Sequence, residues 1–470
     1  MYHIDFNVPK TVHFIGIGGI SMSGLAEILL DEGFTVSGSD SQASDLTKHL
    51  ESMGAKVYIG QRAENIGDGI DVVVYTAAIH PDNPEFMAVQ AKGIPMLSRA
   101  ELLGQMMKNY RQALAVAGTH GKTTTTSMLA EIFMAAGTDP TISVGGILDS
   151  IGGNIRVGGS RLFLMEACEY TNSFLSFNPT MEIILNIEAD HLDFFKDIED
   201  IRHSFRLFAE KLPADGALII NSDIRDYEEI VEGLPCQVFT FGSDPQKSRM
   251  CAENITYDEF ARPSFTLLID GERWDRITLG VPGEHNVYNA LAAITAAILQ
   301  GVGLEPVIEG LKNYRGTHRR FEYKGVKNGI VIVDDYAHHP QEIEATLKAA
   351  LNYPHRKIWC LFQPHTYSRV KRLFDDYLTC TQAADFTLVT DIYAAREKDP
   401  GDIKASQIVE GMRAHGVNAV HTPTFDDTEA YLRAHWQPGD LVLTMGCGNI
   451  NQLNDQIWEH EQAKETNAKC

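Results

Sequence analysis

The sequence predicts an α/β protein of three domains, each built on a mostly parallel β-sheet. The chain has 470 residues, which exceeds what one hydrophobic core usually supports and favours about three domains. Apolar runs that suit buried strands alternate with helical stretches, and short glycine-containing connections join them. A third observation is the segment 115–128, AVAGTHGKTTTTSM, which has the pattern of a strand, a glycine turn and the start of a helix.

The first domain is expected over residues 1–108 and should be Rossmann-like. Short glycine connections between its strands and helices predict a parallel, doubly wound sheet. Its signals, in chain order, are the strand VHFIGIG, the helix SGLAEILLDEG, and the strands FTVSGSD and DVVVYTAA.

The second domain, residues 109–317, is expected to be of the P-loop type. After the glycine turn of 115–128 come two strands that are apolar along most of their length, as strands covered on both faces are. A further glycine turn leads into an alanine-rich stretch that is strongly helical. The strands are RLFLMEA and MEIILNI, and the helical stretch is GVPGEHNVYNALAAITAAILQGVG.

The third domain, residues 318–470, should be a second Rossmann-like unit, and the arginine-rich segment NYRGTHRRFE marks the crossing into it. Its strand candidates are GIVIVDDYA, KIWCLFQPH, DFTLVTDIY and DLVLTMGCG. Because the carboxyl ends of parallel strands meet at one edge of a sheet, the polar residues that end these strands should line one rim. These polar segments are DDYAHH, QPHTYSR, DIYAAREKD and GCGN.

Composition and charge exclude several classes of function. The formal net charge of −23 disfavours nucleic acid and anionic membranes as partners. Seven widely spaced cysteines without a C-x-x-C pair indicate reduced thiols rather than disulfides or zinc. The N-terminus lacks the pattern of a signal peptide, and glycines interrupt the apolar segment 11–30 too often for a membrane span. We therefore expect a cytoplasmic protein, and either a monomer or a homodimer is compatible with the sequence.

The segment 115–128 predicts a binding loop for a nucleoside triphosphate. Glycines let the backbone turn and point N–H groups into one concavity, at which the following helix directs its positive dipole end. Lys122 supplies a cation for phosphate oxygens, and the Thr123 hydroxyl can ligate a magnesium ion. The strict pattern has a glycine where this chain has Val116, and the alternative is a plain strand–helix turn with a surface lysine. The predicted loop comprises Gly118, Thr119, His120, Gly121, Lys122, Thr123 and Thr124.

An earlier glycine loop resembles a dinucleotide fingerprint, with Ser21 where the third glycine would be. Asp40 ends the next strand, in the right place to accept hydrogen bonds from a ribose. From these residues alone, a nicotinamide cofactor, another nucleotide diphosphate and simple close packing of a helix on a strand all stay open. The loop consists of Gly16, Gly18, Gly19 and Ser21.

Acidic and imidazole groups end the two strands of the second domain. Glu166 and Glu169 follow one strand, and Asp190 and His191 follow the other. A carboxylate at a strand tip beside a phosphate loop is the expected way to hold Mg²⁺. We expect His191 to contact the metal, with a purely structural histidine as the alternative.

Two further groups of residues are candidates for ligand binding. The amides of Asn286 and Asn289 offer a donor and an acceptor together, which suits an adenine edge, although Asn286 can also cap the helix. In the third domain, the guanidinium of Arg369 can bind a substrate carboxylate through two hydrogen bonds, with His365 on the same rim. Arg396 is a weaker candidate, for which solvated surface is the alternative.

The order of these motifs resembles that of the Mur ligases of bacterial peptidoglycan synthesis. The similarity extends collinearly over about residues 11–450, which no single motif gives by chance. The segments that carry it are GIGG, GTHGKTTT, EACEYTNSFL, NIEADHLD, GEHNVYNALAA, HRRFE, DDYAHHP, FQPHTYSR, DIYAAREKD and GCGNI.

The resemblance implies a function for each domain: the first binds a UDP-sugar, the second ATP and Mg²⁺, and the third the incoming amino acid. It is strongest to the branch that joins L-alanine to the lactyl carboxylate of UDP-N-acetylmuramate through an acyl phosphate. A sister branch that adds a tripeptide to the same sugar nucleotide is the nearest rival. A nicotinamide-dependent oxidoreductase and a non-catalytic nucleotide switch are rivals of other classes, and neither explains all of the motifs.

The resemblance also assigns roles to single residues. Beyond the phosphate loop, Asn286 and Asn289 would contact adenine, Arg320 the γ-phosphate and Asp335 the ribose of ATP. Thr123, Glu166 and His191 would be the magnesium ligands, and the first glycine loop with Asp40 would hold the UDP-sugar. Tyr336, His338, His365 and Arg369 would surround L-alanine. Lys122, Arg320 and His338 are the expected catalytic residues, His338 as a base for the amine.

The sequence departs from the family pattern at three places. The magnesium segment commonly reads EADESD, whereas here it is EACEYT. The amino-acid loop often reads HRYSR, and here Thr366 replaces the first arginine, which leaves Arg369 as the main partner for a carboxylate. The stretch RHSFRLF lacks the lysine that sister ligases carry in carbamylated form, which fits the L-alanine branch.

Overall fold

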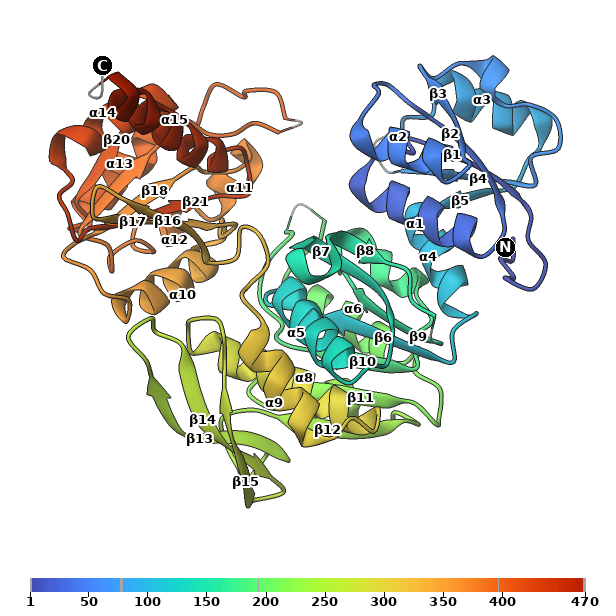
Figure 1. Cartoon of the computed structure of the whole chain (residues 1–470), viewed down its shortest axis with the longest axis horizontal. Helices are drawn as coiled ribbons and strands as arrows, with labels where there is room; N and C mark the ends of the chain where they lie inside the picture. The colour runs from blue at the N-terminus through green and yellow to red at the C-terminus, as the bar shows by residue number, and fades with distance from the viewer. Residues whose placement is uncertain (1, 77–78, 160, 193, 396, 468–470) are drawn as a thin grey trace. The chain divides into compact units, whose positions relative to one another are not determined.

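The computed structural model describes residues 2–76, 79–159, 161–192, 194–395 and 397–467 (Figure 1). Three separate sheets of five, ten and six strands, each accompanied by helices, confirm the predicted α/β fold of three domains. By contacts the chain divides into two compact units, Met1–Cys251 with Leu291–Gly310 and Ala252–Ala290 with Leu311–Cys470, which are described separately below. No helix within the described ranges has the length and apolar character needed to cross a bilayer.

The first sheet has the strand order β3-β2-β1-β4-β5, and all its strands run parallel. The glycine loop follows β1, the central strand. From β1 the chain adds β2 and β3 on one side and then β4 and β5 on the other, and ligands of such sheets bind at this change of direction. The strands are β1 Thr11–Ile15, β2 Thr35–Asp40, β3 Lys56–Ile59, β4 Val72–Tyr75 and β5 Met96–Ser98. The helices are α1 Ile20–Asp31, α2 Asp45–Ser52, η1 Ala63–Asn65, α3 Pro84–Lys92 and α4 Arg99–Met107.

The second sheet has the order β15-β14-β13-β12-β11-β10-β6-β9-β7-β8. Its strands are β6 Gln112–Ala117, β7 Thr141–Leu148, β8 Gly153–Arg156, β9 Leu162–Glu166, β10 Met181–Ile184, β11 Ala217–Asn221, β12 Gln237–Phe241, β13 Met250–Tyr257, β14 Pro263–Ile269 and β15 Glu272–Thr278. The helices are α5 Lys122–Ala135, η2 Asp149–Ile151, η3 Tyr170–Ser176, α6 Ile198–Ala209, α7 Glu228–Val231, α8 His285–Leu299 and α9 Leu304–Asn313.

The central strand β6 pairs in parallel with β10 on one side and with β9 on the other. Both neighbours follow β6 in the chain after long connections, so their carboxyl ends, and the polar loops that follow them, flank the loop after β6. This strand order positions the candidate site.

The strands predicted from the sequence did not include the antiparallel pairs that form the edges of two sheets. The pair β14–β15 is antiparallel and turns at Asp270 and Gly271, whose φ values of 51° and 80° fit the Asp-Gly hairpin turn. The pairs β7–β8 and β16–β17 are also antiparallel. Each sheet nevertheless keeps a parallel majority, as predicted.

The third sheet has the order β16-β17-β21-β18-β19-β20, and only β16 is antiparallel to its neighbour. The polar ends of β17, β21, β18 and β19 therefore share one edge, as predicted from the sequence. The strands are β16 Glu322–Lys327, β17 Ile330–Asp335, β18 Ile358–Phe362, β19 Phe386–Val389, β20 Ala419–His421 and β21 Leu441–Met445. The helices are α10 Pro340–Leu351, α11 Tyr367–Arg372, α12 Phe374–Tyr377, α13 Ala405–Ala414, α14 Phe425–His435 and α15 Asn451–Asn467.

Helix α4 packs closely against η3. A Cβ atom built on Gly104 would lie 1.9 Å from the Ser176 carbonyl oxygen, so only glycine allows the two backbones this approach. The Asn178 amide donates to the Gly104 carbonyl at 2.9 Å. Buried residues of α4 and η3, among them Leu102 and Phe174, belong to one hydrophobic core. The first and second sheets are thereby tied together.

Candidate active site

The predicted phosphate loop leaves the buried strand β6 and enters α5, as the sequence indicated. Gly118 has a φ of 142°, and a Cβ there would lie 2.9 Å from the Cβ of Leu185. Asn186, just after β10, holds the loop from one side: its side chain accepts from the His120 N–H at 2.8 Å and donates to the His120 carbonyl at 3.0 Å. The loop is therefore fixed by the neighbouring strand.

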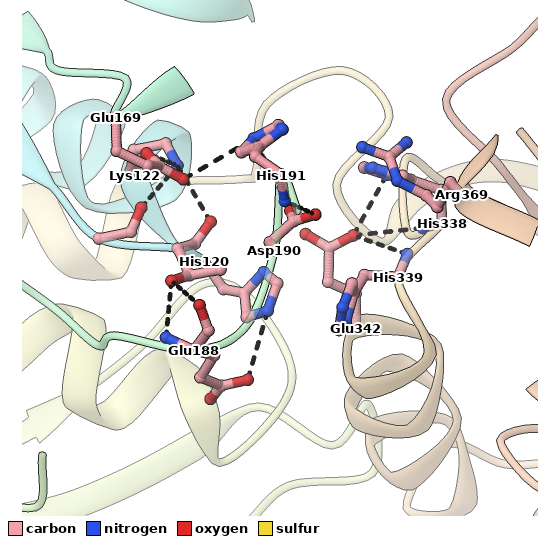
Figure 2. Close-up of polar contacts among 12 residues, drawn as sticks. His120, Lys122, Glu169, Glu188, Asp190, His191, His338, His339, Glu342 and Arg369 are labelled. Carbon is pink, nitrogen blue, oxygen red and sulfur yellow. Dashed lines mark hydrogen bonds and ion pairs between the residues drawn. The ribbon is translucent and has the colours of Figure 1, made fainter. Parts of the chain in front are cut away.

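Lys122 lies at the centre of this loop (Figure 2). Its Nζ donates to the carbonyls of Gly118 at 2.5 Å and Thr119 at 3.0 Å, and to Glu169 Oε2 at 3.0 Å. Burial opposes the charge on this amine, but the carboxylates of Glu169 and Glu166 raise its pKa above the usual range. Lys122 is thus a buried, permanently charged cation, as a phosphate ligand must be.

Thr123 and Glu166 form a second oxygen-rich contact beside Lys122. The Thr123 hydroxyl donates to Glu166 Oε2 at 2.9 Å, and the Gly145 N–H donates to the same oxygen at 2.9 Å. Glu166 ends β9, which pairs with β6 in register. Thr124 follows in the first turn of α5 and is half-buried.

His191 lies beside the carboxylates of Glu169 and Asp190. Its Nε2 lies 3.8 Å from Glu169 Oε1 and 3.8 Å from Asp190 Oδ2 (Figure 2). Its ring packs on Tyr170 with centroids 4.6 Å apart. Its backbone has a φ of 50°, which is uncommon outside glycine and is found at functional sites. Glu169, only 2% exposed, therefore contacts both Lys122 and His191.

The first glycine loop is braced by Asp40. The Gly18 N–H donates to Asp40 Oδ2 at 2.9 Å, and the N–H groups of Gly16 and Ile17 donate to the Ser39 carbonyl. Gly19 is the N-terminal cap of α1, and Ser21 lies in its first turn. Asp40 thus supports the loop itself, a role in addition to the ribose contact expected from the sequence.

Asn286 and Asn289 begin α8 and are each 6% exposed. The Asn286 amide donates to the Pro282 carbonyl at 2.7 Å, and Asn289 donates to Asn286 Oδ1 at 2.9 Å. The two side chains therefore order each other and the turn before the helix, but these contacts are not N-terminal capping, in which a side-chain oxygen accepts from a backbone N–H.

The two arginines before β16 have different surroundings. Arg319 pairs with the buried Asp334 at 3.2 Å and donates to the carbonyls of Gly446 and Gly448. Arg320 lies with its guanidinium 5.0 Å from the centroid of the Tyr336 ring. Arg319 is therefore a structural anchor within the third domain, and its guanidinium also lies 5.0 Å from the centroid of the Tyr336 ring.

The carboxyl group of Asp335 accepts hydrogen bonds from nearby backbone N–H groups. Its two oxygens accept from the N–H groups of Phe321 and Ala337, each at 2.7 Å. Burial raises the pKa of Asp335 to about 6, against the opposing effect of Arg320. The carboxyl group orders the start of the third domain, and a ribose contact would be an additional role.

His338 lies beside Glu342, on the first turn of α10 (Figure 2). Its Nδ1 is 3.3 Å from Glu342 Oε2 and 3.2 Å from the Tyr336 carbonyl, and its N–H donates to Glu342 Oε2 at 3.2 Å. A carboxylate on one face of an imidazole orients the ring and stabilises its protonated form. This arrangement suits proton acceptance.

His365 and Arg369 lie together after β18. Arg369 Nη1 is 3.3 Å from His365 Nδ1, and the His365 ring stacks on Tyr393 at 5.7 Å. Burial, with the charge of Arg369, lowers the pKa of His365 to about 4, so the ring is neutral near pH 7. Thr366 between them has a φ of 59°, an outlier for a β-branched residue. Arg396 lies outside the described residues.

Several contacts were missed in the sequence. The ion pair of Glu169 with Lys122 and the loop support by Asn186 depend on which strands are neighbours, whereas the carboxylate of Glu342 beside His338 is a local contact. A further pair joins His120 Nε2 and Glu188 Oε2 at 3.5 Å. The Glu342 contact had a signal, because it lies four residues after His338 at a helix start.

Models of known families match the chain in three consecutive segments. Residues 11–111 match "Mur ligase family, catalytic domain", residues 116–297 match "Mur ligase middle domain", and residues 319–448 match "Mur ligase, glutamate ligase domain".

Individual proteins match over their whole length. A UDP-N-acetylmuramate–L-alanine ligase of Lachnospira eligens is 59% identical over 457 residues, which cover 97% of this chain and 100% of the relative. One of Acetivibrio thermocellus is 49% identical, with 98% of each chain covered. The crystal structure of UDP-N-acetylmuramate–alanine ligase MurC from Thermotoga maritima matches with a TM-score of 0.79 at 29% identity, covering 97% of this chain and 100% of that one. The chain belongs to the Mur ligase family.

Proposed function

We propose that this chain is an ATP-dependent ligase that joins L-alanine to the lactyl carboxylate of UDP-N-acetylmuramate. This reaction is the first amino-acid addition in peptidoglycan precursor synthesis. It would take place in the cytoplasm and serve cell-wall growth and cell division. The observation that carries the proposal is the charged Lys122, whose amine donates to the loop carbonyls of Gly118 and Thr119 and to Glu169, in a chain 59% identical to a ligase of that name.

We propose three domains with the bounds predicted from the sequence: 1–108 for the UDP-sugar, 109–317 for ATP and 318–470 for the amino acid. The UDP-sugar would bind Gly16, Gly18, Gly19, Ser21 and Asp40. ATP would bind the phosphate loop with Asn286, Asn289, Arg320 and Asp335. L-alanine would bind Tyr336, His338, His365 and Arg369.

The donor set beside the phosphate loop fits Mg²⁺. Thr123, Glu166 and His191 supply oxygen and imidazole ligands, and the carboxylate of Glu166 lies within hydrogen-bonding distance of the Thr123 hydroxyl. In the described part of the chain, no three His, Cys, Asp or Glu side chains form a ready metal cage. Mg²⁺ does not require one, because it usually takes one or two carboxylates together with phosphates and waters. A bound Mg²⁺ would neutralise the charge of the transferring phosphoryl group.

The reaction follows from the weakness of a carboxylate as an electrophile. A lactyl carboxylate oxygen forms a bond to the γ-phosphorus of ATP while the bond to the β-phosphate oxygen breaks, which releases ADP and leaves an acyl phosphate. Lys122 would spread the charge of this transfer. The amine of L-alanine then attacks the acyl carbon, and phosphate leaves as the amide forms.

His338 would accept the proton that the attacking amine must lose. The carboxylate of Glu342 next to its ring favours the protonated form that results. Arg369 would hold the L-alanine carboxylate nearby. His365 beside it is neutral and therefore carries no charge that would compete with the substrate carboxylate for Arg369.

The proposal is tested by phosphate release from ATP. Release should require both UDP-N-acetylmuramate and L-alanine, and the product should be their amide. A preference for a tripeptide over L-alanine would favour the recycling branch instead, and binding of NADH to the first domain would favour an oxidoreductase. Phosphate release without either substrate would contradict a ligase.

Glu166→Gln should shift the dependence of activity on Mg²⁺ to higher concentration. A neutral amide is a poorer ligand for a hard cation, while its oxygen can still accept from Thr123 and Gly145. The measurement is a titration of ligase rate against Mg²⁺, with Glu228→Gln on the exposed surface of α7 as the matched control. An unchanged curve for Glu166→Gln would mean that another group, with Glu169 the first candidate, holds the ion.

Gly18→Val should raise the Michaelis constant for the UDP-sugar and leave that for ATP nearly unchanged. A Cβ at this position would lie 2.9 Å from Asp40 Oδ2, so either the loop or the Asp40 side chain that braces it must shift. Asp40→Ala should act in the same direction, because the Gly18 N–H loses its acceptor. Steady-state kinetics with each substrate varied in turn checks this, and a larger effect on ATP would contradict the domain assignment.

A further inference from the structure

Arg99 occupies a fixed place at the ligand-binding edge of the first sheet. It is the first residue of α4 and directly follows β5, so it lies at the same carboxyl edge as the first glycine loop. Its backbone is held by a capping box, in which Ser98 and Glu101 exchange hydrogen bonds at 2.7 Å and 3.2 Å. The start of α4 is therefore rigid.

The same helix is fixed against the second domain. The contact of Gly104 with the Ser176 carbonyl and the bond from Asn178 hold α4 on η3. Helix η3 begins directly after Glu169, the ion-pair partner of Lys122. Arg99 is thus placed both by the glycine loop of the first domain and by the segment that touches the phosphate loop.

Among the described residues, no carboxylate forms an ion pair with the guanidinium of Arg99. Its Nη1 donates to the Ser21 hydroxyl at 3.1 Å. The side chain of Cys168 lies close enough to Arg99 to interact with it electrostatically. Burial lowers the pKa of Arg99.

An arginine with these surroundings is suited to binding an anion. Guanidinium has five N–H donors in a planar fork, and a partly buried charge with one neutral partner is costly. An anion bound between Ser21 and Cys168 would remove that cost. Glu166 and Glu169 interact electrostatically with Cys168, so an acidic substrate that approaches Cys168 is favoured by a cation beside it.

We propose that Arg99 binds the lactyl carboxylate of the sugar nucleotide and directs it toward the phosphate loop. The inference rests on the proposed function, which requires a carboxylate to pass from a nucleotide held by the first domain to the γ-phosphate at Lys122. Arg99 contacts the glycine loop through Ser21. It also lies near Cys168, which directly precedes Glu169, the ion-pair partner of Lys122. A bidentate pair would also orient the attacking oxygen.

The test compares two ligands that differ only in the lactyl group. UDP-N-acetylmuramate carries the carboxylate, and UDP-N-acetylglucosamine is the same sugar nucleotide without the lactyl ether. Their dissociation constants are measured by calorimetry for the full chain, for Arg99→Ala and for Arg99→Lys. Arg161→Ala, at an exposed position of the same unit, is the matched control.

Arg99→Ala should weaken UDP-N-acetylmuramate by about tenfold or more, as expected for a charge-assisted hydrogen bond, and leave UDP-N-acetylglucosamine unchanged. Arg99→Lys keeps the charge without the fork and should recover part of the loss. The Michaelis constant for ATP should not move in any variant.

Equal weakening of both sugar nucleotides by Arg99→Ala would overturn the proposal, because Arg99 would then serve the diphosphate. No weakening of either, or a lowered melting temperature with losses for ATP as well, would also overturn it in favour of a structural role. If the unmodified chain binds neither sugar nucleotide, the proposed function itself fails, and this outcome is distinct from the others.

Discussion

Replacing Lys122 with alanine should reduce the rate of ATP-dependent ligation by a factor of about 10²–10³, the usual cost of removing a group that stabilises transferring charge. The effect should fall on kcat, because the lysine contacts the phosphates most strongly when charge moves between them. Stopped assays of ADP formation at saturating substrates measure this. Near-normal turnover in the variant would refute the assignment of the phosphate loop.

The buried ion pair adds a stability effect that must be separated from catalysis. Without Lys122, the carboxylate of Glu169 is left buried and unpaired, which typically costs about 3–5 kcal/mol. The double variant Lys122→Ala with Glu169→Gln removes that charge and should regain most of the melting temperature, but none of the activity. If activity returned with stability, Lys122 would be structural only.

Replacing Arg369 with alanine should raise the Michaelis constant for L-alanine about 30-fold or more. Losing one partner of a buried charge pair costs about 2–5 kcal/mol, and Thr366 leaves no second arginine in this loop to compensate. The Michaelis constants for ATP and the UDP-sugar should stay nearly unchanged. Arg372→Ala, an exposed position on the same helix α11, is the matched control.

The Arg369 variant also separates the two half-reactions. Acyl-phosphate formation precedes attack by the amine, so it should survive. Hydroxylamine, supplied in place of L-alanine, traps the acyl phosphate as a hydroxamate that can be quantified. A variant that yields no hydroxamate would mean that Arg369 serves ATP or the sugar nucleotide, and the proposed role of the third domain would then be wrong.

Features with a local cause could be predicted from the sequence. The phosphate loop, the glycine loop and the strands before them follow from short runs of residues whose turn geometry and periodicity are self-contained. The parallel order of β17, β21, β18 and β19 then brings DDYAHH, QPHTYSR and GCGN to one edge without further information. The family resemblance rested on these same segments.

Features that depend on strand order could not be predicted. Glu169 and Lys122 are 47 positions apart and meet because β9 pairs with β6, and Asn186 reaches the loop because β10 pairs with β6 on the other side. The chemistry of HRRFE alone does not indicate that Arg319 pairs with the buried Asp334. The hairpin β14–β15, in contrast, had a local signal in Asp270-Gly271 that was overlooked.

The approach of Gly104 to the Ser176 backbone has a consequence for protein engineering. A chimaera that takes residues 1–108 from another ligase imports α4 but keeps the η3 of the host, so the two surfaces must still fit without a side chain at position 104. A donor with a residue larger than glycine at position 104 would place a side chain against the Ser176 backbone and push α4 away from η3. For such a donor, module exchange should therefore succeed only when α4 and residues 170–178 are transferred together, although they lie on opposite sides of the predicted boundary at residue 108.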